Sequence, residues 1–509
     1  MTDMKYRISV EKKSEYQIEA RSLQNELNEI FSLKIDGLRI INIYDVEGFT
    51  PKLIEKAKYG VFGEMATDVV SVLDEHEALM ESLVATNPLF APQSNIGSCF
   101  AIESLPGQFD QRAASAVDCI HLIDPEAKVR ITAARLIVFP GKLTPSQLDK
   151  IKAYCINKVE CREKNLRKIG TETIPNPENP VREFIEGFRF LDKRGLNTLI
   201  KTRGLAINID DLHCIQNYFI NESREPTLTE LMILDTYWSD HCRHTTFNTI
   251  IDKLEVEDSF IADDIRGTFR RYDVMRRSVR RDRTPHTLMD MGTIGARWLR
   301  KNGYLSDLER SEENNACSIY VTVNVKRRNS VTAEKWLLQF KNETHNHPTE
   351  IEPFGGASTC LGGAIRDPLS GRSYVYQAMR VTGAGDIYKP VAETLKGKLP
   401  QRIISRKAAA GYSSYGNQIG LATTHVREIF HDGYTAKRME VGAVVGAVKA
   451  SDVRRESPAP GDVILLLGGR TGRDGIGGAT GSSKEHTEES LEACGSEVQK
   501  GNAPEERKI

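Results

Sequence analysis

Residues 335–348 read Lys-Trp-Leu-Leu-Gln-Phe-Lys-Asn-Glu-Thr-His-Asn-His-Pro. The apolar first half, Lys335–Lys341, predicts a β-strand. Pro348 disfavours helical geometry at His347, so the extended conformation is expected to continue to the proline. The stretch therefore predicts a strand that runs from a buried sheet into a run of ionisable groups.

Side chains of an extended segment alternate between two faces, so Lys341, Glu343, His345 and His347 are expected to share one face. That face offers a cation, a hard oxygen ligand and two imidazoles. Phosphate pairs with the first, Mg²⁺ prefers the second, and an imidazole transfers protons. This density favours a reaction site over the alternative, a polar surface strand.

A glycine-rich segment follows, Gly355-Gly-Ala-Ser-Thr-Cys-Leu-Gly-Gly-Ala-Ile-Arg-Asp367. Glycines let backbone N–H groups approach phosphate oxygens, so a phosphate-binding loop is expected here. Arg366 can pair with phosphate and Asp367 can ligate Mg²⁺. The segment matches neither the Walker A pattern nor Gly-x-Gly-x-x-Gly. A purely structural turn is the alternative.

Two further motifs could bind ligands. Ser239-Asp-His-Cys-Arg-His244 predicts a helix with His241 and His244 on one side, for which an active-site histidine is favoured over a buried capping histidine or a zinc site. Gly468–Gly478 follows a predicted strand, Asp462–Leu467, and contains two arginines. That order is typical of an anion site, with a long hairpin loop as the alternative.

The flanking regions give the domain organisation. Before residue 165, strands near 6–10, 38–46, 99–103 and 129–139 alternate with helices, which predicts two strand–helix–strand units paired edge to edge. Independent α+β packing of the two units is the alternative. A proline-rich linker is expected near 165–180, then mostly helix to about residue 250. Residues 266–283 carry eight arginines, which on a helix are expected to be a solvated face rather than a phosphate site.

Composition excludes several classes. The chain has 69 Lys or Arg and 70 Asp or Glu, a net charge of −1, which does not favour a nucleic-acid partner. No apolar run reaches the ~18 residues of a membrane span. Nine scattered cysteines without a Cys-x-x-Cys pair favour the cytoplasm.

Lys341–Pro348, Gly356–Asp367 and Ser239–His244 together resemble the phosphoribosylformylglycinamidine synthase family, the fourth step of purine biosynthesis. Gly468–Gly478 and Val498-Gln499 are similar to that family as well. The resemblance implies an ATP-dependent carbon–nitrogen ligase of the glutamine amidotransferase class. Its substrates would be ATP, formylglycinamide ribonucleotide (FGAR) and ammonia from glutamine, with Mg²⁺ as cofactor.

The long single-chain form of the family implies an α+β architecture in four parts. These are a ferredoxin-like N-terminal domain (1–165), a helical linker (166–240), a domain similar to the A domain of aminoimidazole ribonucleotide synthetase (241–435) and the start of a B domain (436–509). The second core half and the C-terminal glutaminase domain, the ammonia source, are not recognised. The chain is therefore expected to be an N-terminal fragment, inactive by itself.

The resemblance also implies residue roles. His241 and His345 would be catalytic, the latter as proton acceptor; Glu343 and Asp367 would bind the metal. Residues carried over to ATP are Lys341, His244 (in place of a tyrosine of the short form), Gly356, Ala357, Thr359, Gly362 and Gly363. Those carried over to substrate are Thr344, Asn346, His347, Arg366 and Gln499. Whether the 356–367 loop binds ATP or the FGAR phosphate stays open.

Three other functions remain as alternatives. One is another ATP-dependent enzyme of the aminoimidazole ribonucleotide synthetase superfamily, although the N-terminal region and the Ser239–His244 motif are not expected there. A second is a non-catalytic nucleotide-binding or assembly module. A metal-dependent nuclease is disfavoured by the chain's charge.

Overall fold

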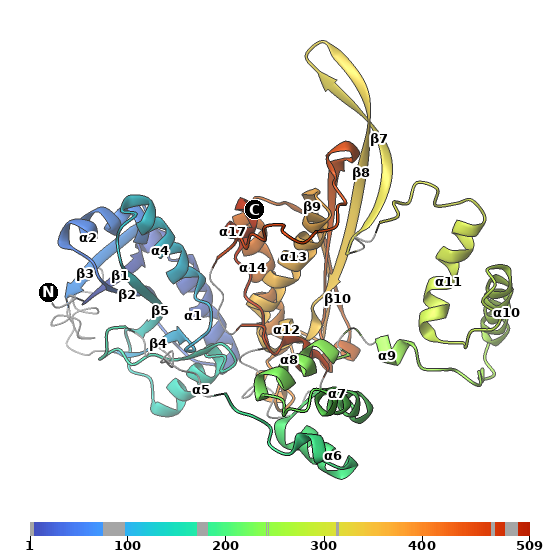
Figure 1. The fold of residues 1–509 in the computed structure, drawn as a ribbon. Coiled ribbons are helices and arrows are strands. Elements are labelled where there is room, and N and C mark those ends of the chain that lie inside the picture. The colour runs from blue at the N-terminus through green and yellow to red at the C-terminus, as the bar shows by residue number, and fades with distance from the viewer. Residues whose placement is uncertain are drawn as a thin grey trace.

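The computed structural model describes residues 5–74, 97–170, 182–240, 242, 244–311, 315–469, 474–483 and 497–509. Two β-sheets and a helical segment form the body of the molecule, and two helices lie apart from it (Figure 1). Within these ranges no helix combines the length and the hydropathy needed to cross a membrane.

The first sheet has six strands in the order β3-β1-β2-β5-β4-β6. Its two strand–helix–strand units pair through β2 and β5, as the sequence predicts, with Ile43 opposite Ala134. Apolar residues of both strands face helices α1, α4 and α5. The elements are β1 (Lys5–Lys12), α1 (Ile18–Phe31), β2 (Arg39–Glu47), α2 (Pro51–Ala57), β3 (Asp68–Asp74), β4 (Ser98–Ser104), α4 (Gln111–Ile123), β5 (Arg130–Phe139), α5 (Pro145–Cys155) and β6 (Cys161–Glu163).

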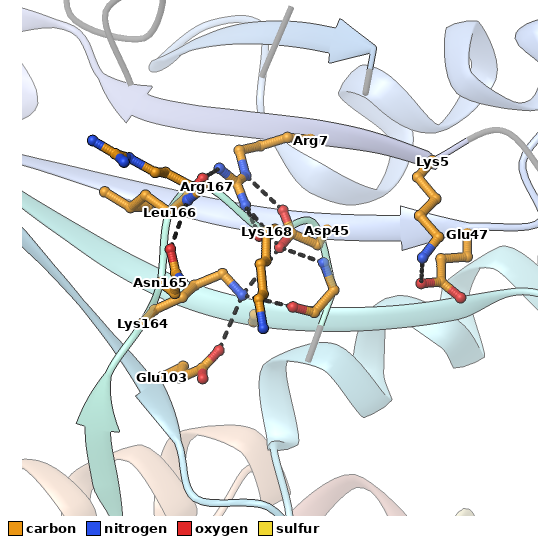
Figure 2. Close-up of polar contacts among 12 residues, drawn as sticks. Lys5, Arg7, Asp45, Glu47, Glu103, Lys164, Asn165, Leu166, Arg167 and Lys168 are labelled. Carbon is orange, nitrogen blue, oxygen red and sulfur yellow. Dashed lines mark hydrogen bonds and ion pairs between the residues drawn. The ribbon is translucent and has the colours of Figure 1, made fainter. Parts of the chain in front are cut away.

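A network of buried charges lies on the opposite face of this sheet (Figure 2). Arg7 donates to both carboxylate oxygens of Asp45, at 2.7 and 3.0 Å. Lys164 bridges Asp45 and Glu103, at 3.0 Å from each. Arg7 also donates to the carbonyls of Leu166 and Lys168, so the network fixes the segment after β6 against the sheet.

Three helices form the next part: α6 (Lys193–Arg203), α7 (Ile209–Asn221) and α8 (Leu228–Trp238). They enclose their own apolar core, centred on Phe188, Leu212 and Leu231. Thr227 and Glu230 form a capping box at the start of α8, as their spacing predicts. The proline-rich stretch expected to be a linker lies largely outside the described residues.

The second sheet has five strands in the order β10-β9-β11-β8-β7. Its strands are β7 (Cys317–Arg327), β8 (Ser330–Thr344), β9 (Tyr374–Ala384), β10 (Thr423–Phe430) and β11 (Met439–Lys449). β11 pairs antiparallel with β8 on one side and with β9 on the other. The expected domain boundary at 435/436 is therefore wrong, because β11 completes the sheet of the preceding segment.

Helices α13 (Pro353–Ser370) and α14 (Gln401–Ile419) cover one face of this sheet, and α17 (Ala503–Lys508) packs beside them (Figure 1). The short helices are α9 (His244–Phe247), α12 (Asn346–Ile351) and α15 (Gly478–Ser483). Helices α10 (Ala262–Ser278) and α11 (Leu288–Lys301) pack on each other, away from the sheet, and the β7–β8 hairpin projects beyond it.

Candidate active site

Three ionised side chains meet where the end of β8 lies against α13. Lys341 Nζ is 2.7 Å from Asp367 Oδ2 and 3.3 Å from Glu343 Oε2. The strand alternation places Lys341 and Glu343 on one face, and α13, packed on that face, supplies Asp367. Burial lowers the pKa of Lys341, but the bond to Asp367 and both carboxylate charges outweigh it and raise the pKa above its ordinary value.

This donor set fits Mg²⁺. Glu343 and Asp367 already hold one cation, the Lys341 ammonium, between their oxygens. Among the described residues no group of three or more potential metal ligands gathers. A magnesium ion would thus have two protein carboxylates, and phosphate oxygens and water would complete its shell, which is how Mg²⁺ is usually bound beside phosphates.

The extended segment ends earlier than predicted. β8 stops at Thr344 and α12 begins at Asn346, so His347 lies on a helix and not on the strand face of Lys341. The His345 N–H donates to the carbonyl of Glu440, and Asn346 Oδ1 accepts from the Glu440 N–H. These two bonds to β11 fix the turn that sequence periodicity could not foresee.

His345 stands at this turn with an unusual environment. Its Nε2 is buried and has no hydrogen-bond partner among the described residues. Burial, with smaller effects from Arg366 and His347, lowers the pKa of His345 to about 4. The imidazole is therefore neutral near pH 7 and has a free nitrogen that can accept a proton.

His347 is held by two residues that the sequence did not single out. Its Nε2 lies 2.8 Å from Glu497 Oε2, and Lys437 Nζ lies 3.2 Å from its Nδ1. An ammonium only donates, so Nδ1 accepts and Nε2–H donates to the carboxylate. Glu497 is 150 residues away in the sequence, which leaves no local signal for the contact.

The prediction of a phosphate-binding loop at 356–367 is wrong, because these residues form the interior of α13. Their backbone N–H groups bond within the helix and cannot cradle a phosphate. The glycines permit close packing instead. A Cβ on Gly356 would lie 2.4 Å from the Thr349 nitrogen, and one on Gly362 would lie 2.7 Å from the Tyr415 hydroxyl.

The other residues carried over to nucleotide or substrate differ in exposure. Ala357 is fully buried, Gly363 is partly exposed, and Thr359 donates to the carbonyl of Gln499. Arg366, exposed, pairs with Asp367 at 2.9 Å. Thr344 and the Gln499 side chain are exposed as well. Their roles stay predictions.

A network of buried charged side chains is centred on Glu440, the residue of β11 that holds this turn. Glu440, fully buried, accepts from Arg380 at 2.6 Å and from Arg438 at 3.0 Å. Glu440 is also the residue whose backbone holds His345 and Asn346. No sequence pattern singled out these three residues, because Arg380 and Glu440 stand in strands that otherwise predict a core and Arg438 directly precedes β11.

Comparisons with known proteins find several members of one family. A family model described as the formylglycinamide ribonucleotide amidotransferase linker domain matches residues 196–244. The PurL subunit of phosphoribosylformylglycinamidine synthase from Thermoplasma acidophilum is 25% identical over 296 residues, 58% of this chain and 31% of the relative. The same subunit from Methanothermobacter marburgensis is 38% identical over 149 residues, 29% of this chain and 20% of the relative.

The chain is similar to the phosphoribosylformylglycinamidine synthase family, both in this linker segment and in the stretches that match its PurL relatives. It spans a third or less of the length of these two curated relatives. A solved structure titled T. maritima PurL complexed with FGAR is 21% identical, with a TM-score of 0.33, and covers 62% of this chain and 36% of that one.

The synthase-family linker match ends at the Ser239–His244 motif. The expected helix through the motif is wrong at its start, since α8 ends at Trp238 and the short α9 begins at His244. His244 is exposed. The predicted catalytic residue His241 lies outside the described residues.

The second predicted anion site, Gly468–Gly478 after an expected strand, also differs from the prediction. Residues 462–467 form no strand, and Val463 to Leu467 are each at least 73% exposed. An apolar run forms a strand only where a neighbouring strand or core covers it, and nothing among the described residues does so here. The arginines of the following loop, Arg470 and Arg473, lie outside the described residues.

Proposed function

We propose that this chain provides an ATP site and part of the FGAR site of a phosphoribosylformylglycinamidine synthase. The reaction converts FGAR, ATP and ammonia to formylglycinamidine ribonucleotide. The observation that carries the proposal is the Lys341–Glu343–Asp367 cluster beside the neutral His345. Similarity to the family gives the substrate class, and the cluster gives the means to hold a phosphoryl group.

The amide oxygen of FGAR is a poor leaving group, so it must first be phosphorylated. Lys341 would neutralise charge on the transferred phosphoryl group, which is the main requirement of such transfers. Magnesium, held by Glu343 and Asp367, would supply further charge neutralisation when bound.

Ammonia then attacks the activated carbon, and phosphate leaves. His345 would accept the proton that the attacking nitrogen loses. With a pKa of about 4, the His345 imidazole is a weak base before substrates bind. Negative charge from the bound phosphates would raise that pKa, so the base would strengthen as the site fills.

Substrate contacts would come from the residues around the turn. Arg366 donates to Asp367 through Nε and is otherwise exposed, so its remaining N–H groups could meet a phosphate. We assign Thr344, Asn346, His347 and Gln499 to FGAR, and His241 to catalysis. Gly356, Ala357, Thr359, Gly362, Gly363 and His244 stay predictions for ATP, and the helical geometry of 356–363 gives their backbone no role in phosphate binding.

Ammonia would come from a glutaminase domain or partner, and the reaction would take place in the cytoplasm. We propose that the first sheet is the family's ferredoxin-like N-terminal domain, that α6–α8 are its linker, and that the second sheet with α13 and α14 is the A domain similar to aminoimidazole ribonucleotide synthetase. Residues after β11 would begin the B domain.

The test is the Mg²⁺-dependent part of ATP binding to the chain, measured by calorimetry with Mg²⁺ and again with EDTA. Lys341→Ala is expected to weaken the Mg²⁺-dependent ATP affinity tenfold or more. Glu343→Gln is expected to abolish the dependence of ATP affinity on Mg²⁺. Lys335→Ala is the matched control, because Lys335 lies on the same strand and contacts the Tyr320 ring instead. Equal affinity of all three variants and the wild type would overturn the proposal.

A further inference from the structure

A cleft between the carboxyl ends of α10 and α11 is lined almost entirely by cations. Its volume is about 650 Å³, within the range of small-molecule sites. Six of its eight lining residues are basic: Arg280, Arg281, Arg297, Arg300, Lys301 and Arg310. The other two are Ser278 and Val279, so no carboxylate of the described residues lines the cleft.

Ordinary structural roles account for only two of these six cations. Arg281 pairs with Asp290 at 2.5 Å, and Lys301 donates to the carbonyl of Ser278 at the end of α10. The second contact is the usual one for a cation at a helix C-terminus. Within the described ranges no acidic side chain lies at ion-pair distance from Arg280, Arg297, Arg300 or Arg310.

The backbone at Arg280 gives an independent indication. Its φ is +58°, and the N–H of Arg281 bonds to the carbonyl of Arg276 in the pattern that closes a helix. Glycine is the usual residue at this left-handed position, because any Cβ there costs about 1 kcal/mol. An arginine here keeps a strained backbone and places its charge at the cleft.

The cluster is local. Residues 262–310 contain twelve Lys or Arg and seven Asp or Glu, whereas the whole chain is balanced at −1. Like charges that share a cleft repel one another, so an anion bound among them relieves that repulsion. Guanidinium groups match phosphate oxygens in pairs, which favours phosphate over a lone carboxylate.

We propose that this cleft is a second anion site, separate from the Lys341 cluster, which binds the phosphate chain of a small polyphosphorylated ligand such as a nucleoside triphosphate. No carboxylate among its described lining residues could hold a metal ion, so binding is expected to be independent of Mg²⁺. A compact ligand is favoured over an extended nucleic acid, because six of these cations line one cleft.

The experiment titrates the chain with inorganic triphosphate in EDTA at physiological salt, where the proposed Mg²⁺-dependent site does not contribute. Saturable binding at one site is expected, weakened tenfold or more by Arg297→Glu combined with Arg300→Glu. The matched control is Arg270→Glu with Arg271→Glu, the same charge change on exposed positions of α10 outside the cleft, and it should alter affinity less than twofold. Equal weakening by both pairs, or no saturation below millimolar concentration, overturns the proposal.

Arg280→Gly separates a binding role from a structural one. The substitution removes a cation and also the backbone strain of a side chain at a left-handed position. The melting temperature should therefore stay equal or rise, whereas triphosphate affinity should fall at least threefold. A stable variant with unchanged affinity overturns the assignment of Arg280. Parallel titrations with ATP and with duplex DNA identify the source of the phosphate, and tighter binding of DNA than of triphosphate contradicts a small-ligand site.

Discussion

Lys500 Nζ lies 2.6 Å from Glu352 Oε2, and this pair joins three distant parts of the chain. Glu352 precedes α13, Lys500 precedes α17, and Glu160, from the first sheet's segment, lies 3.6 Å from the same ammonium. Val159, Ile351 and Val498 pack together beside them. Lys500, shared by two carboxylates, therefore connects the N-terminal part of the chain to the segment that leads into α13.

Lys500→Met should lower the free energy of unfolding by about 3 kcal/mol, because it leaves the fully buried Glu352 carboxylate without its cation. Chemical denaturation monitored by circular dichroism measures this. Lys508→Met, which breaks an exposed pair with Glu505, is the control and should change stability by less than about 0.5 kcal/mol. Adding Glu352→Gln to Lys500→Met should restore part of the loss. If it does not, the charges are not the cause.

Two glycines of α13 should respond in opposite directions to alanine. Gly356→Ala should destabilise the chain by about 3 kcal/mol, because the new Cβ would lie 2.4 Å from the Thr349 nitrogen. Gly363→Ala should stabilise it by about 0.5 kcal/mol, since its nearest neighbour would be the Arg366 side chain at 3.8 Å and alanine favours helices. Thermal unfolding of both variants checks this. A phosphate-binding loop would predict no such difference.

Glu506 should make stability depend on pH. Burial raises the pKa of Glu506 to about 7, and the Tyr415 hydroxyl donates to it at 2.6 Å. The folded chain therefore holds this proton more tightly than the unfolded chain, whose carboxyl has the ordinary pKa of 4.5. The stability from this group is complete below pH 4.5 and is lost as the pH rises through 7.

Glu506→Gln mimics the protonated form and should remove this loss. Between pH 5 and pH 8, the variant should gain about 2 kcal/mol relative to the wild type, a figure reduced for the partial exposure of Glu506. Denaturation of both proteins at the two pH values measures it. A constant difference across this range would show that Glu506 is ionised throughout.

The charge network of the first sheet in Figure 2 offers a matched pair of substitutions. Asp45→Asn should cost about 3 kcal/mol, because Arg7, 0% exposed, would lose its counter-charge and Lys164, 3% exposed, would keep only Glu103. Glu47→Gln breaks the half-exposed pair with Lys5 on the same strands and should cost less than about 1 kcal/mol. Similar effects of both would contradict the role assigned to burial.

The sequence predicted the parts of the fold that depend on local patterns. Alternating apolar residues located β1, β2, β4 and β5, and the spacing of Thr227 and Glu230 located the start of α8. Of the site, it located Lys341, Glu343 and Asp367, whose carboxylates and ammonium do meet. Residue type identified all three residues, and the two-residue alternation of a strand placed Lys341 and Glu343 on one face.

The failures came from contacts between distant residues. The turn at His345 depends on Glu440, and the orientation of His347 depends on Glu497 and Lys437. Glycines that predicted a loop serve helix packing against Thr349 and Tyr415. Composition alone cannot distinguish a glycine needed for phosphate approach from one needed for close packing.

The central place of β11 bears on how the chain folds during synthesis. β8 and β9 do not pair with each other, because β11 lies between them and pairs with both. The first residue of β11 follows the end of β8 by 95 residues. At about 5–20 residues per second, the ribosome needs roughly 5–20 s to supply that stretch. The β8 edge is open for that interval and the β9 edge for its later part, after Ala384 has been added, so chaperone protection would matter most at this point of translation.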